Sequence, residues 1–194
     1  MFVVVLLLIL NAAISWWNCY AVGAVWAESK ALGGFIRLVA WSAAIQSAVG
    51  FSSVIGFLVG SVLVETGVLP MQVARAAADL WYLLIIIPVL GSGLIITIHS
   101  WIAAFRERSI TNMGVAAYNT FAQASNMYQA ASAVPNAWRG VAGLFDSDDE
   151  AAGKLVILAV LLAVGSLLAG VALTAFLIRH YSRRLPLPAR EVAA

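Results

Sequence analysis

Uncharged polar side chains recur at helical spacing inside two strongly apolar segments in the first third of the chain. Asn11, Ser15 and Asn18 follow an i, i+4, i+7 pattern. Gln46 and Ser53 lie seven residues apart, so each set falls on one face of a helix. Amides and hydroxyls form hydrogen bonds without carrying charge, and inside a membrane they either join helices or line a neutral, hydrated path. We therefore expect interhelical hydrogen bonds at these positions, with a polar path as the alternative.

A further set of amides lies in segment 109–138, which contains no charged residue but is much more polar than the apolar segments. Asn112, Asn119, Gln123 and Asn126 share one helical face, while alanine and aromatic residues share another. The pattern predicts an amphipathic helix. Its last three amides join the first set as candidates for a polar path or for contacts between helices.

One histidine, His99, lies within an apolar segment. An intramembrane histidine either relays protons or packs as a hydrogen-bonded residue, and the second role is the more common. Neither a second histidine nor a carboxylate lies at metal-ligand spacing from it, and the single cysteine, Cys19, excludes a cysteine metal cluster. The sequence also lacks phosphate-loop, nucleophile-elbow and zinc-protease motifs. We therefore expect a protein that is not an enzyme and that holds no cofactor or metal.

These polar residues are carried by long stretches without Asp, Glu, Lys or Arg. About 20 predominantly apolar residues form a helix that crosses a hydrocarbon layer roughly 30 Å thick. Four stretches meet that length, and the predicted spans are 2–27, 38–64, 80–105 and 155–178. With 63% hydrophobic and 10% charged residues, the chain could not cover a soluble surface with polar groups. The predicted fold class is an all-α, polytopic integral membrane helix bundle, with one domain at 1–185 and a flexible tail at 186–194.

The amphipathic segment leaves the number of spans open. If it lies on the membrane surface or re-enters the membrane, the chain has four spans, and the basic residues divide almost evenly between the two sides. If it crosses as a fifth span, eight of the 11 basic residues collect on one side, as the positive-inside rule favours. These eight are Lys30, Arg37, Arg106, Arg108, Arg179, Arg183, Arg184 and Arg190. The cost of amides at membrane depth opposes a fifth span, so the interfacial or re-entrant helix stays slightly ahead.

Prolines and glycines predict irregular helix geometry at two places. Pro88 lies within the third span, and Gly91 and Gly93 follow closely, so this region is a candidate hinge. Pro135, with Asn136 after it, predicts the end of the amphipathic helix.

Small residues at four-residue spacing predict close packing between helices. Gly56 and Gly60 form a GxxxG motif in the second span, and Gly165 with Ala169 forms a similar pair in the last span, where Gly170 belongs to another. Such motifs are frequent by chance in a chain rich in glycine and alanine. They suit packing within the chain or between copies of it.

The sequence indicates a non-enzymatic, multi-pass membrane protein that acts as an oligomeric structural or assembly subunit of a membrane complex. A channel or pore with a neutral, amide-lined path is one alternative, and a proton-coupled small transporter that uses His99 is another. The expected partners are membrane lipid and either further copies of the chain or other subunits. The net charge of +2 gives no argument for nucleic acid.

Composition and charge also suggest where the protein resides. Nine arginines against two lysines, in a chain rich in alanine and valine, suggest a bacterial or phage source. We therefore expect an integral protein of the bacterial inner membrane, with the arginine-rich C-terminal tail in the cytoplasm.

Overall fold

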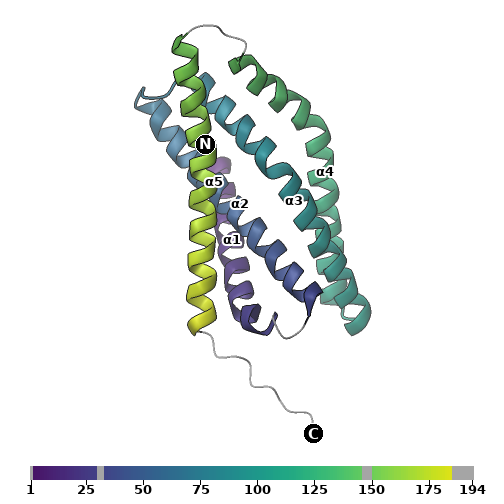
Figure 1. Ribbon diagram of the computed structural model, residues 1–194. Coiled ribbons are helices and arrows are strands. Elements are labelled where there is room, and N and C mark those ends of the chain that lie inside the picture. Colours follow the sequence, from purple (N-terminus) through teal and green to yellow (C-terminus); the bar gives the residue numbers. More distant parts are fainter. Residues whose placement is uncertain (1, 30–32, 146–149, 185–194) are drawn as a thin grey trace.

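The computed structural model describes residues 2–29, 33–145 and 150–184, and within these ranges the chain consists of five long helices without a strand. The helices are α1 (Phe2–Ser29), α2 (Gly34–Glu65), α3 (Met71–Glu107), α4 (Ile110–Phe145) and α5 (Glu150–Arg184). They run down and up in turn and form a bundle (Figure 1). The predicted all-α bundle is therefore confirmed. The predicted flexible tail at 186–194 lies outside the described residues.

Four of the described helices, α1, α2, α3 and α5, are long and apolar enough to cross a membrane. Large apolar side chains on their surfaces are widely exposed, for example Leu7 at 58%, Ile87 at 80% and Leu161 at 63%. An apolar exterior on this scale matches the hydrocarbon of a bilayer rather than water. The chain is thus an integral membrane protein, as its sequence predicts. The helices extend beyond the predicted spans at most of their ends.

The fourth helix, α4, lies antiparallel to α3 along most of its length (Figure 1). The connection between the two helices consists of only Arg108 and Ser109. Arg108 takes the left-handed conformation, with a φ of 46°, and its N–H donates to Ala104 O at 3.0 Å, which closes the end of α3. A connection this short joins antiparallel neighbours, so α4 returns along α3.

The face of α4 that packs on α3 is built mainly from small residues at seven-residue intervals. Its buried members are Ala116, Gln123, Ala130 and Ala137. A strict seven-residue repeat is typical of helices that cross at a shallow angle, and small side chains let two backbones approach closely. Trp101 Nε1 donates to Thr120 Oγ1 at 2.9 Å, and Gln123 Nε2 donates to Leu90 O at 2.9 Å. Side-chain hydrogen bonds thus join the two helices at several levels along their length.

The amphipathic character of α4 is the reverse of that of a helix on a soluble protein. Phe121 and Tyr128 are 75% and 78% exposed, whereas the Gln123 amide is buried against α3. Lipid solvates aromatic side chains well, while amides need polar partners, so this orientation suits a helix surrounded by hydrocarbon. By composition α4 is not among the helices apolar enough to span a membrane.

The predicted end of the amphipathic helix at Pro135 is wrong, because α4 continues through this residue. A proline inside a helix removes one backbone hydrogen bond, but packed membrane helices tolerate it where neighbouring groups compensate. Here Ser132 Oγ donates to Gln129 O at 3.0 Å, and Asn136 Nδ2 donates to Ser132 O at 3.3 Å. Both bonds are made to carbonyls in the turns before Pro135, and neither is made to Ala131 O, the carbonyl that loses its backbone donor.

The candidate hinge in α3 is also continuous helix, from Pro88 through Gly91 and Gly93. Ser92 Oγ donates to Pro88 O at 2.6 Å in the turn that follows the proline, whereas the carbonyl that loses its backbone donor is that of Leu84. Space around Gly91 is open, whereas Gly93 lies against α4. A hinge at this place stays a prediction.

The central helix of the bundle is α2, which contacts α1, α3 and α5. Gly170 of α5 lies directly against the backbone of α2, and Gly56 and Gly60 of α2 face α5 in return. Gly165 is exposed with open space around it, and Ala169 is half-buried. Gly56, Gly60 and Gly170 therefore pack α2 against α5 within the chain, whereas Gly165 makes no such contact.

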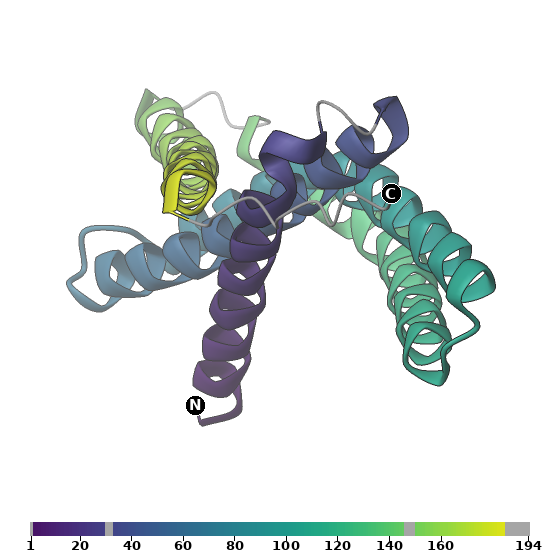
Figure 2. The same ribbon diagram turned by 90° about the horizontal axis from the view of Figure 1, so that it is seen from below.

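One side of the bundle is open. Within the described residues, α1 packs on α2 and α5 but makes no backbone contact with α3 or α4. Seen from below, α1 and the α3–α4 pair extend from α2 in different directions (Figure 2). The polar residues of α1 and α4 therefore face one another across a separation rather than across a packed interface.

Candidate functional site

The polar faces of α1 to α4 meet at a cavity of about 250 Å³ on the open side of the bundle, which we call the amide cavity. Its amide and hydroxyl side chains are Asn11, Gln46, Ser53, Tyr82, Asn126 and Gln129. The other lining residues are Gly50, Trp81 and the aliphatic residues Val49, Ile85, Ile86 and Val89. None of the lining residues carries a charge. The cavity can therefore form hydrogen bonds with neutral polar groups through these amides and hydroxyls.

Asn11 joins α1 to α2 at one wall of the amide cavity. Its Nδ2 donates to Ser53 Oγ at 2.7 Å and to Gly50 O at 3.4 Å. Ser53 Oγ donates in turn to Gly50 O at 2.8 Å. Ser15, one turn along α1, is 2% exposed, and its hydroxyl lies directly against Gly50. The absence of a side chain at Gly50 is what lets the two polar faces approach.

Gln46 joins α2 to α3 at the next wall. Its Nε2 donates to Ser92 Oγ at 2.8 Å and to Val89 O at 3.0 Å. Both acceptors lie within one turn of Pro88, near the middle of α3. The donor group of Gln46 is therefore fully used within the chain, at a level well inside the length of the helix.

The opposite wall is formed by two amides of α4. Asn126 is half-buried and Gln129 is exposed, and Gln129 Nε2 donates to Ser125 Oγ at 3.1 Å on its own helix. Since α1 makes no backbone contact with α4, these amides border the open side of the cavity. Polar groups near the middle of α4 thus lie beside an opening between two helices.

Several residues that the sequence placed on a polar path lie elsewhere. Those outside the lining of the amide cavity are Ser15, Asn18, His99, Asn119 and Gln123. Gln123 bonds to α3 instead, and Asn119 accepts a hydrogen bond from Thr97 Oγ1 through its backbone oxygen at 3.3 Å. The ring of His99 packs beside that of Phe35, with a centroid distance of 6.1 Å. The structure therefore brings three of the six predicted amides, Asn11, Gln46 and Asn126, together in one cavity and leaves the other three and the histidine outside it.

Among the polar and aromatic lining residues, sequence reasoning missed three: Trp81, Tyr82 and Gln129. Gln129 follows Asn126 by three residues, and this helical spacing could have added it to the amide face. The two aromatic residues carried no such signal, because tryptophan and tyrosine at the start of an apolar span are equally typical of the membrane interface.

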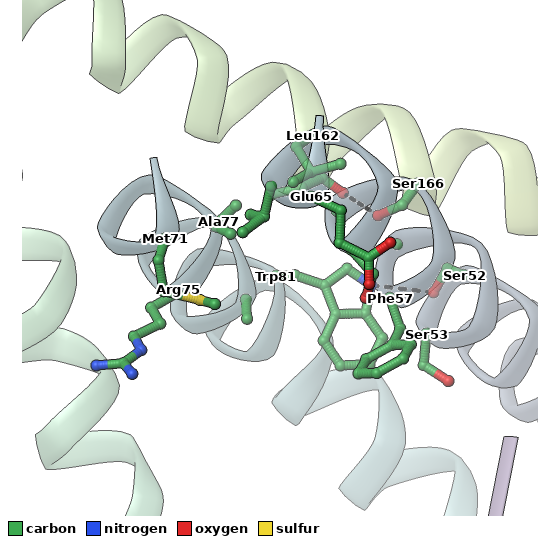
Figure 3. A pocket seen from close by; sticks show the side chains of 17 residues that line it. Ser52, Ser53, Phe57, Glu65, Met71, Arg75, Ala77, Trp81, Leu162 and Ser166 are labelled. Atoms are coloured by element: carbon green, nitrogen blue, oxygen red, sulfur yellow. Dashed lines mark hydrogen bonds between the residues drawn. The ribbon is translucent and has the colours of Figure 1, made fainter. Parts of the chain in front are cut away.

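A larger, apolar groove of about 530 Å³ lies between α2, α3 and α5 (Figure 3). Its floor is made of small residues, among them Gly56, Gly60, Ala77, Ala78 and Ala163. The Trp81 indole projects into it and its Nε1 donates to Ser52 Oγ at 3.0 Å (Figure 3). Trp81 and Ser53 line both this groove and the amide cavity, so they stand between the two spaces.

Charged side chains occur only at one end of the apolar groove. Glu65 and Arg75 are both exposed lining residues, and the Arg75 guanidinium points away from Trp81 in Figure 3. The remainder of the groove is uncharged. Its apolar, small-residue surface suits a lipid chain or another helix rather than a polar ligand.

Across the described ranges, no group of three or more His, Cys, Asp or Glu residues is placed to hold a metal ion. Comparison of the chain with family models, with curated proteins and with solved structures found no match. The fold and the site therefore define a class of protein: an all-α integral membrane protein with a neutral, amide-lined cavity that is open between two of its helices.

Proposed function

We propose that the chain is a subunit of an oligomeric membrane assembly, and that the open side of the amide cavity faces a neighbouring subunit. The observation that carries this proposal is the position of Asn126 and Gln129. Both line a cavity near the middle of α4 whose side towards α1 is not closed by helix packing. The neighbouring subunit is either a further copy of this chain or a different membrane protein with a polar face.

The physical reason is the cost of leaving amides against lipid. Burying an amide in an apolar medium without a hydrogen-bond partner costs on the order of 2 kcal/mol or more. A polar face on a neighbouring helix supplies partners, and each interhelical hydrogen bond contributes roughly 0.6–2 kcal/mol. Two amides on one exposed face therefore favour association over exposure to lipid.

We further propose that α4 crosses the membrane as a fifth span and that the C-terminal end of α5 faces the cytoplasm. Six described arginines lie at the lower end of the bundle in Figure 1, namely Arg37, Arg106, Arg108, Arg179, Arg183 and Arg184. The positive-inside rule assigns an end with this excess to the cytoplasmic side. The excess of arginine over lysine supports a bacterial inner membrane as its location.

The test is the mass of the assembly in mild detergent, measured by light scattering and by native electrophoresis after crosslinking in native membranes. We expect a complex larger than one chain. Gln129→Leu should shift it towards the single chain, because it removes an amide from the open side of the cavity. Ala131→Leu is the matched control, since position 131 is exposed and lies about 200° around α4 from position 129.

Two outcomes would contradict the proposal. The first is a wild-type protein that runs as a single chain in mild detergent and yields only single-chain species after crosslinking. The second is an equal loss of the assembly in both variants, which would mean that any added bulk on α4 disrupts it.

A neutral permeation path is the second candidate, because the lining of the amide cavity is polar, uncharged and drawn from four helices. In liposomes that contain the protein, this function predicts faster uptake of urea or glycerol than in protein-free liposomes. Asn126→Leu should slow the uptake, since it replaces a lining amide with an apolar group. Uptake equal to that of protein-free liposomes would exclude this candidate.

A further inference from the structure

A third cavity, separate from the amide cavity, runs between α2 and α5 at the end of the bundle where α1 finishes, and we call it the interfacial groove. Its volume is about 420 Å³, and it shares no lining residue with the amide cavity. Along α5 it extends from Val171 to Ser182, a rise of about 16 Å. The hydrocarbon of one leaflet is about 15 Å deep, half of the bilayer core. The groove thus matches the depth to which a single lipid chain reaches.

The inner part of the interfacial groove is mainly apolar, and Thr174 of α5 is its one polar lining residue. Ala44, Ile45 and Ala48 line it from α2, and Val171 and Ala175 line it from α5. Small side chains dominate, so the surface between the two helices is hollow rather than filled. A flexible apolar chain is the kind of ligand that such a surface accommodates.

The outer end of the same groove is polar and positively charged. Arg179 and Ser182 lie three residues apart on one face of α5, and Arg179 is exposed. The rings of Trp26 and Trp41 line the same end, with a centroid distance of 5.3 Å and an interplanar angle of 74°. Tryptophan side chains concentrate at the level of lipid headgroups. The groove therefore joins a headgroup-level cation to an apolar interior.

Charge complementarity selects the headgroup. Arg183 and Arg184 follow in the last turn of α5, beyond Arg179. Arginine binds phosphate through two parallel N–H donors, and basic residues near a membrane surface attract anionic lipids. A zwitterionic lipid brings its own cation to this end, so an anionic lipid is favoured over it.

We propose that the interfacial groove binds one anionic phospholipid. Arg179 holds the phosphate, beside the Ser182 hydroxyl, which donates to Arg179 O at 3.1 Å. An acyl chain lies along Ala48 and Ala175 between α2 and α5. The site is independent of the amide cavity, so it holds whether or not the chain assembles with other subunits.

The test is native mass spectrometry of the full chain in detergent, with dioleoyl phosphatidylglycerol or dioleoyl phosphatidylcholine added at equal concentration. We expect the wild type to retain phosphatidylglycerol in preference to phosphatidylcholine. Arg179→Gln should lower its retention by about fivefold, as the loss of one cation near the headgroup implies. Ala175→Phe should lower the retention of both lipids, because it fills the groove and leaves the charge in place. Arg106→Gln, on α3 at the same end of the bundle, is the matched control and should bind as the wild type does.

Three results would overturn the proposal. Equal retention of the two lipids by the wild type would mean that the charged end does not distinguish an anionic headgroup from a zwitterionic one. An equal loss in Arg106→Gln and Arg179→Gln would mean a diffuse attraction to the basic end rather than a site. A disulfide between two copies of an Ala175→Cys variant, in a Cys19→Ala background, would place a second protein in the groove. Thermal unfolding of each variant separates a lost site from a lost fold.

Discussion

The carboxamide of Gln123 occupies the space that a side chain at Gly93 would need. Gln123 is 8% exposed, and its Nε2 donates to Leu90 O at 2.9 Å, three residues before the glycine. A buried amide of α4 thus contacts α3 at Gly93, a position that faces α4 and carries no side chain. The sequence assigned the two residues to different roles, a polar path and a hinge, yet they form one contact between helices.

Gly93→Ala should destabilise the protein by about 1–3 kcal/mol, because the Gln123 amide must leave its hydrogen bond and remain buried without it. Gly91→Ala is the matched control. Space around Gly91 is open, so alanine there should be neutral or stabilising by up to about 1 kcal/mol through helix propensity. Thermal unfolding in detergent, followed by circular dichroism, measures both effects.

The double variant Gly93→Ala with Gln123→Ala tests whether the contact is the cause. Removing the carboxamide removes the clash, so the double variant should be more stable than the sum of the two single effects implies. Additive effects would contradict a direct contact between these positions.

Gly170→Ala should cost more than Gly93→Ala, about 3 kcal/mol or more. A Cβ at Gly170 would meet the backbone of α2 at Ala48 and Ser52, and backbone cannot move aside as a flexible side chain can. Gly165→Ala, five residues earlier on α5, adds its methyl group to open space and should leave stability unchanged or slightly higher. The fraction of monodisperse protein after heating, read by size-exclusion chromatography, compares the two. Equal losses would contradict the close approach of α2 and α5.

Cys19 should react with a maleimide only when the packing of α1, α2 and α5 opens. Its side chain is 0% exposed and belongs to a cluster with Phe51 and Leu177, so labelling in detergent should be slow until a denaturant is added. Gly170→Ala should speed the labelling and Gly165→Ala should not. Rapid labelling of the folded wild type would show that this cluster is open in solution.

The apolar spans and the helical fold could be predicted because both follow from composition and from runs of uncharged residues. The pairing of helices could not, and α4 shows why. Its amides defined one face, but the amide pattern alone does not say which neighbouring helix that face meets. The two-residue connection at Arg108 and Ser109 and the seven-residue repeat of small residues decide the pairing. The sequence prediction used neither the short connection nor this repeat.

The candidate site was predictable in part for a related reason. Asn11, Gln46 and Asn126 belong to separate helices, and helical spacing identified each of them as a polar position. Their convergence depends on how α1, α2 and α4 are arranged, which is tertiary information. The helix end predicted at Pro135 was wrong on the same ground, since packing against a neighbouring helix can override the local preference of proline.

Cysteine labelling of intact cells tests whether α4 crosses the membrane. Ser109 and Gly143 lie near the two ends of α4, a rise of about 51 Å, which exceeds the roughly 30 Å hydrocarbon core. In a Cys19→Ala background, a membrane-impermeant maleimide should label Gly143→Cys from outside and leave Ser109→Cys unlabelled. Thr66→Cys, in the connection from α2 to α3 at the same end of the bundle as Gly143, should label as Gly143→Cys does. Labelling of Ser109→Cys and Gly143→Cys from the same side would mean that α4 does not cross. The basic residues would then divide almost evenly between the two sides, and the argument for a cytoplasmic C-terminus would fall with the fifth span.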